Sequence, residues 1–338
     1  MTESQTGQAG SLLARLNAVV DPATGQTLGE LGCVSSDSDQ AAVVTLPMAA
    51  HPDRAAFEAA VQDAAGDASV SVQRPRRRAG LGAIIAVGSG KGGVGKSTVA
   101  ASLAMGLAEL GASVGLLDAD VYGPSIPHMF GVDGKPAVVQ TPGPDGQPVE
   151  KLVPIEVANL KLISMGFMLA PDQAVVWRGP MVHRAVTQFL VQTSWGELDY
   201  LVVDMPPGTG DVPLTLSQQA GLAGAVVVCT PQQVALLDAG KAIGMFQQVN
   251  IPLLGMVENM TGEVFGRGGA KAKAEQTGIP FLGELSLDSS VRVAADEGRI
   301  FDIIAEGHEK RDELIGIAGR VAVETLRAAA TVPELPQV

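Results

Sequence analysis

Short apolar runs alternate with stretches of helical periodicity from Leu81 onward. These runs are apolar on both faces, as expected for strands that helices cover on two sides. They comprise residues 83–87, 113–118, 201–204, 225–229 and 251–257. The alternation predicts an α/β fold with a doubly wound, mostly parallel sheet. Between 131 and 169, prolines and glycines interrupt the rhythm and indicate an insertion that bears a hairpin.

The first part of the chain has a mixed pattern, which predicts a small α+β domain over residues 11–73. Apolar residues recur at helical spacing over 12–20 and 57–65. Short apolar strands are expected at 41–46 and 70–72.

Residues 74–80 separate this domain from the second one. Their proline and clustered arginines indicate an exposed linker, which we interpret as a solvated hinge. A docking patch for an acidic partner is the alternative. The second domain is expected over residues 81–328, with flexible ends at 1–10 and 329–338.

Composition narrows the class of protein. The 338 residues are 46% hydrophobic and 17% charged, which is enough apolar mass for a large core. A net charge of −13 opposes sequence-independent binding to a phosphate backbone, so we expect no nucleic-acid partner. No apolar run approaches the ~18 residues of a membrane span, and the polar N-terminus lacks the pattern of a signal peptide. We therefore expect a cytoplasmic protein without a membrane partner.

The segment GKGGVGKST follows the apolar run at 83–87. It satisfies the pattern G-x-x-x-x-G-K-[ST] of phosphate-binding loops, and a helix is predicted directly after it. Glycines let backbone N–H groups turn toward phosphate oxygens, and the helix N-terminus adds its dipole. We expect Lys96 to reach the β- and γ-phosphates of ATP, Ser97 to ligate Mg²⁺ and Thr98 to reach the α-phosphate. The expected nucleotide-binding set is Gly90, Gly92, Gly93, Val94, Gly95, Lys96, Ser97 and Thr98.

The loop contains a second lysine, Lys91, which the generic pattern does not require. Since Lys96 already serves the phosphates of its own subunit, Lys91 is predicted to reach the phosphates of a facing subunit. There it would neutralise charge in the transition state, as an arginine finger does. This interpretation implies a homodimer with nucleotide at the interface. The alternative is an exposed lysine that faces solvent.

Three carboxylates at the ends of apolar runs are predicted to complete a catalytic site. Asp118 and Asp120 share one face of a strand end, where ligands bind in parallel sheets. Asp120 is predicted to orient the attacking water. Asp118 is predicted to hold the switch segment that contains Asp120, together with the water molecules bound to the metal. Both could instead be solvent-facing turn residues. Asp204 ends the run LVVD and is predicted to be the Walker-B ligand of Mg²⁺. After it, Gly208 and Asp211 are expected to sense the γ-phosphate and relay its presence.

Together these residues resemble the deviant Walker-A ATPases, the superfamily of MinD, ParA and the nitrogenase iron protein. KGGVGKST is similar to the superfamily signature, and Lys91 matches its trans-acting lysine. Residues 81–325 resemble the Mrp/ApbC group of iron–sulfur cluster carriers within it. The similarity rests on DADVYGPSIPHMFG (118–131), WRGPM (177–181), DYLVVDMPPGTGD (199–211) and TPQQVALLDAGKAI (230–243). Residues 21–25 and 28–32 are similar to the small MIP18-like domain that precedes many Mrp proteins.

This resemblance implies a homodimeric ATPase that uses ATP and Mg²⁺. It also implies binding of iron–sulfur clusters and their transfer to apoproteins, with a scaffold or an apoprotein as partner. By the same resemblance, Thr230, Pro231 and Asn259 lie around the adenine. The amide of Asn259 suits paired contacts to the adenine edge, although an asparagine after a strand could equally be a turn residue.

The chain departs from the resemblance at one place. Mrp-type carriers have a C-x-x-C pair shortly after the Asn-Met of this strand, and thiolates are the usual ligands of cluster iron. Here residues 259–263 run directly into the glycine-rich segment 264–269, so the pair is absent. Of the two cysteines, Cys229 is expected to be a small buried hydrophobe and Cys33 lies in the first domain. His51 is expected to be a lone surface histidine, with ligation as the alternative. No cluster ligand is identified.

Three functions stay open from the sequence. The first is a dimeric Mg-ATPase of the iron–sulfur carrier family. The second is a nucleotide-switched assembly protein that holds no cluster. The third is a positioning ATPase like MinD or ParA, which needs a basic DNA patch or an amphipathic membrane tail. The acidic, proline-broken tail at 331–338 fits neither requirement.

Overall fold

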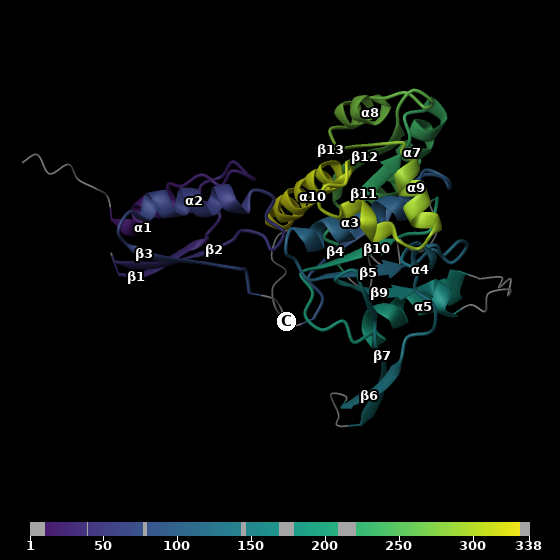
Figure 1. Cartoon of the computed structure of the whole chain (residues 1–338), viewed down its shortest axis with the longest axis horizontal. Helices are drawn as coiled ribbons and strands as arrows, with labels where there is room; N and C mark the ends of the chain where they lie inside the picture. Colours follow the sequence, from purple (N-terminus) through teal and green to yellow (C-terminus); the bar gives the residue numbers. More distant parts are fainter. Residues whose placement is uncertain are drawn as a thin grey trace, which may run out of the picture. The chain divides into compact units, whose positions relative to one another are not determined.

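The computed structural model describes residues 11–38, 40–76, 80–142, 147–168, 179–208 and 221–331 (Figure 1). The chain forms two compact units, Met1–Arg76 and Arg77–Val338. The division falls within the arginine-rich segment at 74–80. Several residues with predicted roles or resemblances lie outside the described ranges, namely Trp177, Arg178, Thr209, Gly210, Asp211 and the tail at 332–338.

The first unit packs two helices on one face of a three-stranded sheet (Figure 1). The helices are α1 (Leu12–Asn17) and α2 (Arg54–Ala65), and the strands are β1 (Val34–Ser38), β2 (Ala41–Thr45) and β3 (Ser69–Gln73). Strand β2 lies in the middle, antiparallel to β1 and parallel to β3. Leu16, Val44 and Phe57 are fully buried between sheet and helices. The apolar pattern does not predict β1, because Val34 is the only apolar residue in that strand.

The second unit is built on an eight-stranded sheet in the order β13-β12-β11-β4-β10-β5-β9-β8. All neighbouring strands run parallel, except that β8 is antiparallel to β9 at the edge. The strands are β4 (Ala83–Gly88), β5 (Val114–Asp118), β8 (Ile155–Val157), β9 (Leu160–Ser164), β10 (Tyr200–Asp204), β11 (Gly224–Cys229), β12 (Leu253–Thr261) and β13 (Phe281–Ser286). The predicted doubly wound, mostly parallel sheet is confirmed. Strand β4 lies near its middle, so the glycine-rich loop opens at the centre of one sheet edge.

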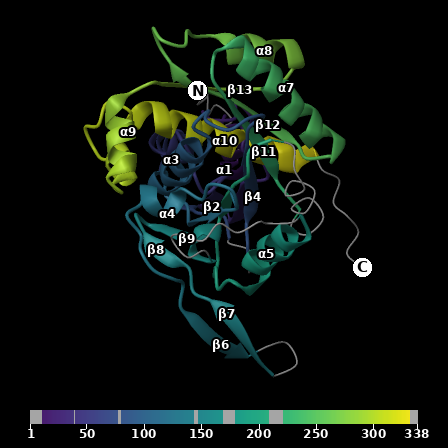
Figure 2. The same ribbon diagram turned by 90° about the vertical axis from the view of Figure 1, so that its right-hand side faces the viewer.

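Helices cover both faces of this sheet (Figure 2). One face carries α3 (Lys96–Glu109) and α10 (Arg311–Thr331), which pack on each other. The other face carries α5 (Gly179–Gln192), α7 (Gln233–Gln248) and α8 (Gly269–Thr277). The shorter helices are α4 (Ile126–Met129), η1 (Met165–Met168), α9 (Ser289–Asp296) and η2 (Ile300–Ile304), of which η2 packs on α3 and α10. Both faces of the central strands are therefore buried, as their uniformly apolar sequences predict.

The insertion at 131–169 contains an antiparallel hairpin of β6 (Val138–Pro142) and β7 (Pro148–Leu152). This hairpin extends away from the large sheet (Figure 1). In the described parts of the chain, none of the helices combines the length and apolarity needed to cross a bilayer.

Candidate nucleotide-binding site

The glycine-rich loop joins the end of β4 to the start of α3. Helix α3 begins at Lys96, and Gly95 before it has a left-handed φ of 78°. A side chain at Gly95 would meet the Asn259 amide at 2.1 Å, and one at Gly90 would meet the Asp238 carbonyl oxygen at 1.9 Å. Both positions therefore require glycine for packing, and Gly95 requires it for its backbone conformation as well. The loop directs the N-terminus of α3 toward the space where a phosphate would bind.

Lys96 is buried beneath this loop and is shared by two carboxylates. Its Nζ lies 2.5 Å from Asp204 Oδ1 and 3.5 Å from Asp120 Oδ2. Strand order explains the arrangement, because β10, which ends at Asp204, lies next to β4. The structure thus brings together three of the residues that the sequence predicts for catalysis and metal binding.

Asp204 has the surroundings of a metal ligand. It is fully buried, and its Oδ2 has no hydrogen-bond partner among the described residues. Burial raises the pKa of Asp204, while Lys96 and the nearby Ser97 hydroxyl act in the opposite direction. A carboxylate oxygen without a partner beside a serine hydroxyl suits Mg²⁺, which prefers oxygen ligands. Asp204 and Ser97 therefore fit the metal predicted from sequence.

Asp118 holds the loop that follows β5. Its Oδ1 accepts from the Asp120 N–H at 3.1 Å, and its Oδ2 accepts from the Ile126 N–H at 3.3 Å and the Ser164 hydroxyl at 2.9 Å. Burial and the charge of Asp204 raise the pKa of Asp118 to about 8. Both oxygens thus have protein donors, and contact with the waters of a metal stays a prediction for this residue.

Asp120 is buried at the other end of the same cluster. Its Oδ1 accepts from the N–H groups of Tyr122 at 3.2 Å and Gly123 at 3.3 Å. Its Oδ2 faces Lys96. Asp118 and Asp120 are each less than a tenth exposed, so neither is a solvent-facing turn residue.

Lys91 lies in the same loop but has different surroundings. Its carbonyl oxygen accepts from the Ser89 hydroxyl at 2.9 Å, which fixes the backbone of the loop. Its side chain is half-buried and forms no ion pair with the described residues. The role of Lys91 across a dimer interface stays a prediction.

The residues predicted to surround adenine lie at the ends of β11 and β12. Asn259 is buried, and its Nδ2 donates to the Val94 carbonyl oxygen at 2.9 Å, so its amide contacts the phosphate loop. The Thr230 hydroxyl bonds to the Gln232 side chain. Pro231 packs against Gly269 at the start of α8. Contact with adenine remains a prediction for Thr230, Pro231 and Asn259.

Two buried polar residues near the site, Glu258 and Ser164, are not predicted from the sequence. Glu258 is fully buried on β12, and its carboxylate accepts from the Gly268 N–H at 2.6 Å and from the Ala270 N–H at the start of α8. Ser164 ends β9 and bonds Asp118. Each is a polar residue within an apolar strand, a signal that could have drawn attention to it.

The segment after β12 is a closed turn. Gly262 and Gly266 exchange two backbone hydrogen bonds, of 3.0 and 2.8 Å. The side chain of Val264 at the tip is 75% exposed. This turn occupies the place where the resemblance expects a cysteine pair.

Both cysteines are buried and free. Burial and the charge of Asp21 raise the pKa of Cys33 to about 11. Burial and the charge of Glu258 raise the pKa of Cys229 to about 12. Neither thiol readily forms the thiolate that iron needs.

The expectation that His51 is a lone surface histidine is wrong. His51 is only 2% exposed, and its Nε2 lies 2.7 Å from Asp21 Oδ1. Its Nδ1 accepts from the Asp53 N–H at 3.2 Å. The buried carboxylate compensates the imidazole for its lost hydration. Because both ring nitrogens have partners, ligation of a metal by His51 would require breaking one of these bonds.

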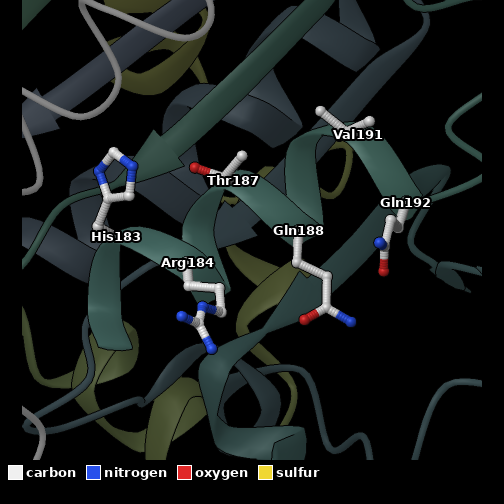
Figure 3. Close-up of a pocket in the computed structure, with 6 residues that line it drawn as sticks. All are labelled: His183, Arg184, Thr187, Gln188, Val191 and Gln192. Atoms are coloured by element: carbon white, nitrogen blue, oxygen red, sulfur yellow. The ribbon is translucent and has the colours of Figure 1, made fainter. Parts of the chain in front are cut away.

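A cavity of the second unit lies away from this site. It has a volume of about 780 Å³, and its lining side chains project from successive turns of α5 (Figure 3). They are His183, Arg184, Thr187, Gln188, Val191 and Gln192. None of them belongs to the phosphate loop or to the carboxylate cluster. Loop geometry, and not cavity size, therefore locates the nucleotide site.

A phosphate loop after a central parallel strand, with carboxylates at the ends of neighbouring strands, defines a P-loop NTPase. Residues 80–322 match the sequence model of the ParA family, described as NUBPL iron-transfer P-loop NTPase. Because this match spans most of the chain, the protein belongs to that family.

Known proteins with similar sequences or structures agree with this assignment. The iron-sulfur cluster carrier protein of Aquifex aeolicus is 48% identical over 250 residues, which cover 71% of this chain and 67% of that protein. A solved nucleotide-binding protein from Archaeoglobus fulgidus, in complex with ADP, is 39% identical with a TM-score of 0.56 and covers 68% of this chain and 91% of that one. The cell division ATPase MinD of Pyrococcus furiosus is 20% identical with a TM-score of 0.53, over 71% of this chain and 98% of that one, and shares the fold alone.

The family match begins at residue 80 and does not include the first unit. The similarity of that unit to MIP18-like domains therefore stays a prediction.

Proposed function

We propose that this chain is a Mg²⁺-dependent ATPase whose nucleotide cycle serves the transfer of iron–sulfur clusters to apoproteins. One observation carries the enzymatic part: Lys96 meets Asp204 and Asp120 beneath the phosphate loop. This set supplies a phosphate-binding cation, a metal ligand and a carboxylate that can orient water.

In the proposed cycle, the ammonium of Lys96 leaves Asp204 and contacts the β- and γ-phosphates. The exchange frees the carboxylate of Asp204, which would hold Mg²⁺ together with the Ser97 hydroxyl. When bound, the metal neutralises charge that develops on the transferring phosphoryl group. Asp120 orients the attacking water, and Asp118 keeps the loop of Asp120 in place.

We further propose that the nucleotide lies at a homodimer interface. Lys91 is the residue that supports this, because its ammonium has no ion-pair partner in the described part of its own subunit. Across the interface it would contact the phosphates bound by the other copy and stabilise the transition state.

The iron–sulfur part of the proposal rests on the family and on relatives named as cluster carriers. ATP binding closes the dimer, hydrolysis opens it, and this cycle drives transfer of the cluster as cargo. Because Cys33 and Cys229 are buried, the thiols that hold the cargo would come from a scaffold or from the receiving apoprotein.

The burial of both thiols also favours a second candidate. In this case the chain is a nucleotide-switched assembly protein that contacts the cluster machinery and holds no cluster. The closed turn from Gly262 to Gly266 is consistent with it, since this turn contains no thiol.

Two anaerobic experiments separate these candidates. The first adds iron and sulfide to the full chain and measures bound iron and visible absorbance. The second follows cluster transfer from a loaded scaffold protein to apo-ferredoxin by visible circular dichroism, with wild type and Lys96→Ala. The carrier proposal predicts that ATP accelerates cluster transfer with wild type and does not accelerate it with Lys96→Ala. Transfer that ATP does not accelerate would contradict it and leave the second candidate, whereas iron bound by the chain alone would exclude the second candidate.

A further inference from the structure

Ser164 occupies a fully buried position beside the carboxylate cluster. It is the last residue of β9, and it pairs in register with Asp118, the last residue of β5. Its hydroxyl donates to Asp118 Oδ2 at 2.9 Å and accepts from the Gly166 N–H at 2.9 Å. Ser164 thereby connects Asp118 to the start of η1.

Asp118 transmits this contact to the loop that carries Asp120. Through its two oxygens it binds the N–H groups of Asp120 and Ile126, at the two ends of that loop. Asp120 in turn faces Lys96 at 3.5 Å. Hydrogen bonds therefore connect Ser164 through Asp118 to the backbone of Asp120, whose carboxylate is assigned to the attacking water.

The Ser164 hydroxyl is the only side-chain donor that Asp118 has among the described residues. A fully buried carboxylate depends on such donors, because it has lost its hydration. Without the hydroxyl, Asp118 would have to turn toward other donors, and the backbone groups of the loop would lose their anchor. The Pro124 ring next to Gly166 shows how closely this loop packs on η1.

We propose that Ser164 is a positioning residue for ATP hydrolysis, which holds Asp118 and thereby sets Asp120 against the phosphate site. This inference rests on the proposed ATPase activity. It assigns to Ser164 no contact with the nucleotide.

The test compares Ser164→Ala with Ser102→Ala in the full chain. Ser102 is a second buried serine, whose hydroxyl has no hydrogen-bond partner in the described part of the chain, so its removal controls for the loss of a buried hydroxyl. We expect Ser164→Ala to lower kcat roughly ten-fold or more, since it leaves a fully buried carboxyl group without its side-chain hydrogen-bond donor, with KM for ATP within about two-fold. Ser102→Ala should leave both parameters unchanged.

A double-mutant cycle tests whether Ser164 acts through Asp118. In the background of Asp118→Ala, the change Ser164→Ala should cause no further loss of kcat, because the residue that it positions is gone. A loss of equal size in both backgrounds would overturn the inference, as would an unchanged kcat in Ser164→Ala alone.

Hydrogen exchange provides a readout that does not depend on turnover. In nucleotide-free protein, the amides of Asp120 and Ile126 should exchange faster in Ser164→Ala than in wild type or Ser102→Ala. Unchanged protection would overturn the inference. If wild type itself fails to hydrolyse ATP, the proposed function fails, and exchange still decides whether Ser164 holds this loop.

Discussion

The ammonium of Lys96 lies 2.5 Å from Oδ1 of Asp204, and both side chains are buried. The residue expected to bind phosphate is thus paired with the residue expected to bind metal. In the proposed cycle, ATP and Mg²⁺ together would replace this internal pair, with the phosphates contacting the lysine and the carboxylate holding the metal. The nucleotide-free site therefore keeps both groups neutralised and ready for exchange.

The ion pair between Lys96 and Asp204 predicts the effect of Asp204→Asn. The substitution removes the metal-binding charge, so Mg²⁺-dependent hydrolysis should fall by more than about 100-fold, since metal stabilisation of the transition state amounts to several kcal/mol. Binding of metal-free ATP should persist, because Lys96 remains. Phosphate release and nucleotide fluorescence titration measure the two effects. Asp302→Asn, which breaks only an exposed pair with Arg299, is the control. Equal hydrolysis in Asp204→Asn and wild type would refute the Walker-B assignment.

Lys91 predicts complementation between subunits. Lys91→Ala should bind ATP almost normally but hydrolyse it slowly, whereas Lys96→Ala should not hydrolyse it at all. In a mixed dimer, the Lys91→Ala subunit keeps Lys96 and receives Lys91 from its partner. Mixing the two variants should therefore restore part of the activity.

The matching control is Lys271→Ala, which changes an exposed lysine on α8 and should leave the rate unchanged. Mixtures that show only the sum of the separate rates would place Lys91 in its own subunit's site or outside catalysis.

The sequence predicts the sheet and the phosphate loop because both depend on local patterns. Apolar runs define β4, β5, β10, β11 and β12, and the glycine spacing defines the loop. The partners of Lys96 depend on strand order, which no local pattern contains. Strand β10 follows β4 by more than a hundred residues yet lies beside it, and this brings Asp204 to Lys96.

Other residues escape sequence analysis because their surroundings are non-local. His51 looks like a surface residue until Asp21, thirty residues earlier, supplies a buried partner. Ser164 looks like an ordinary strand end until β9 aligns with β5. In each case the role of a single polar residue depends on a carboxylate from another segment of the chain.

The two native thiols should resist alkylation in the folded protein. With pKa values of about 11 for Cys33 and about 12 for Cys229, the thiolate fraction at pH 8 is ~0.1% or less, and burial limits access further. Iodoacetamide should label neither thiol in native protein and both after denaturation, as counted by mass spectrometry. Val264→Cys, at the exposed turn, should add one rapidly labelled thiol. Rapid native labelling of Cys33 or Cys229 would show a thiol that a cluster could reach.

The Asp21–His51 pair predicts acid sensitivity of the first unit. Burial acts to raise the pKa of Asp21, but hydrogen bonds from His51 and Thr24 outweigh it and leave that pKa below the usual 3.8. The unfolded chain therefore binds a proton at higher pH than the folded one. The stabilisation is present above pH 3.8 and is lost as the pH falls through the lower folded value.

Asp21→Asn should remove this part of the pH dependence, while Asp63→Asn, an exposed change on α2, should retain it. Urea titrations of the full chain at several pH values, followed through the His51 ring resonances, measure the difference. Identical pH profiles for wild type and Asp21→Asn would mean that the pair does not stabilise this unit.

The most direct test of the account is the release of phosphate from ATP by the purified full chain, with Mg²⁺ and with EDTA, beside Lys96→Ala. The arrangement of Lys96, Asp120 and Asp204 predicts turnover that requires Mg²⁺ and that disappears in Lys96→Ala. Absence of hydrolysis in wild type with Mg²⁺, or an equal rate in Lys96→Ala, would contradict it.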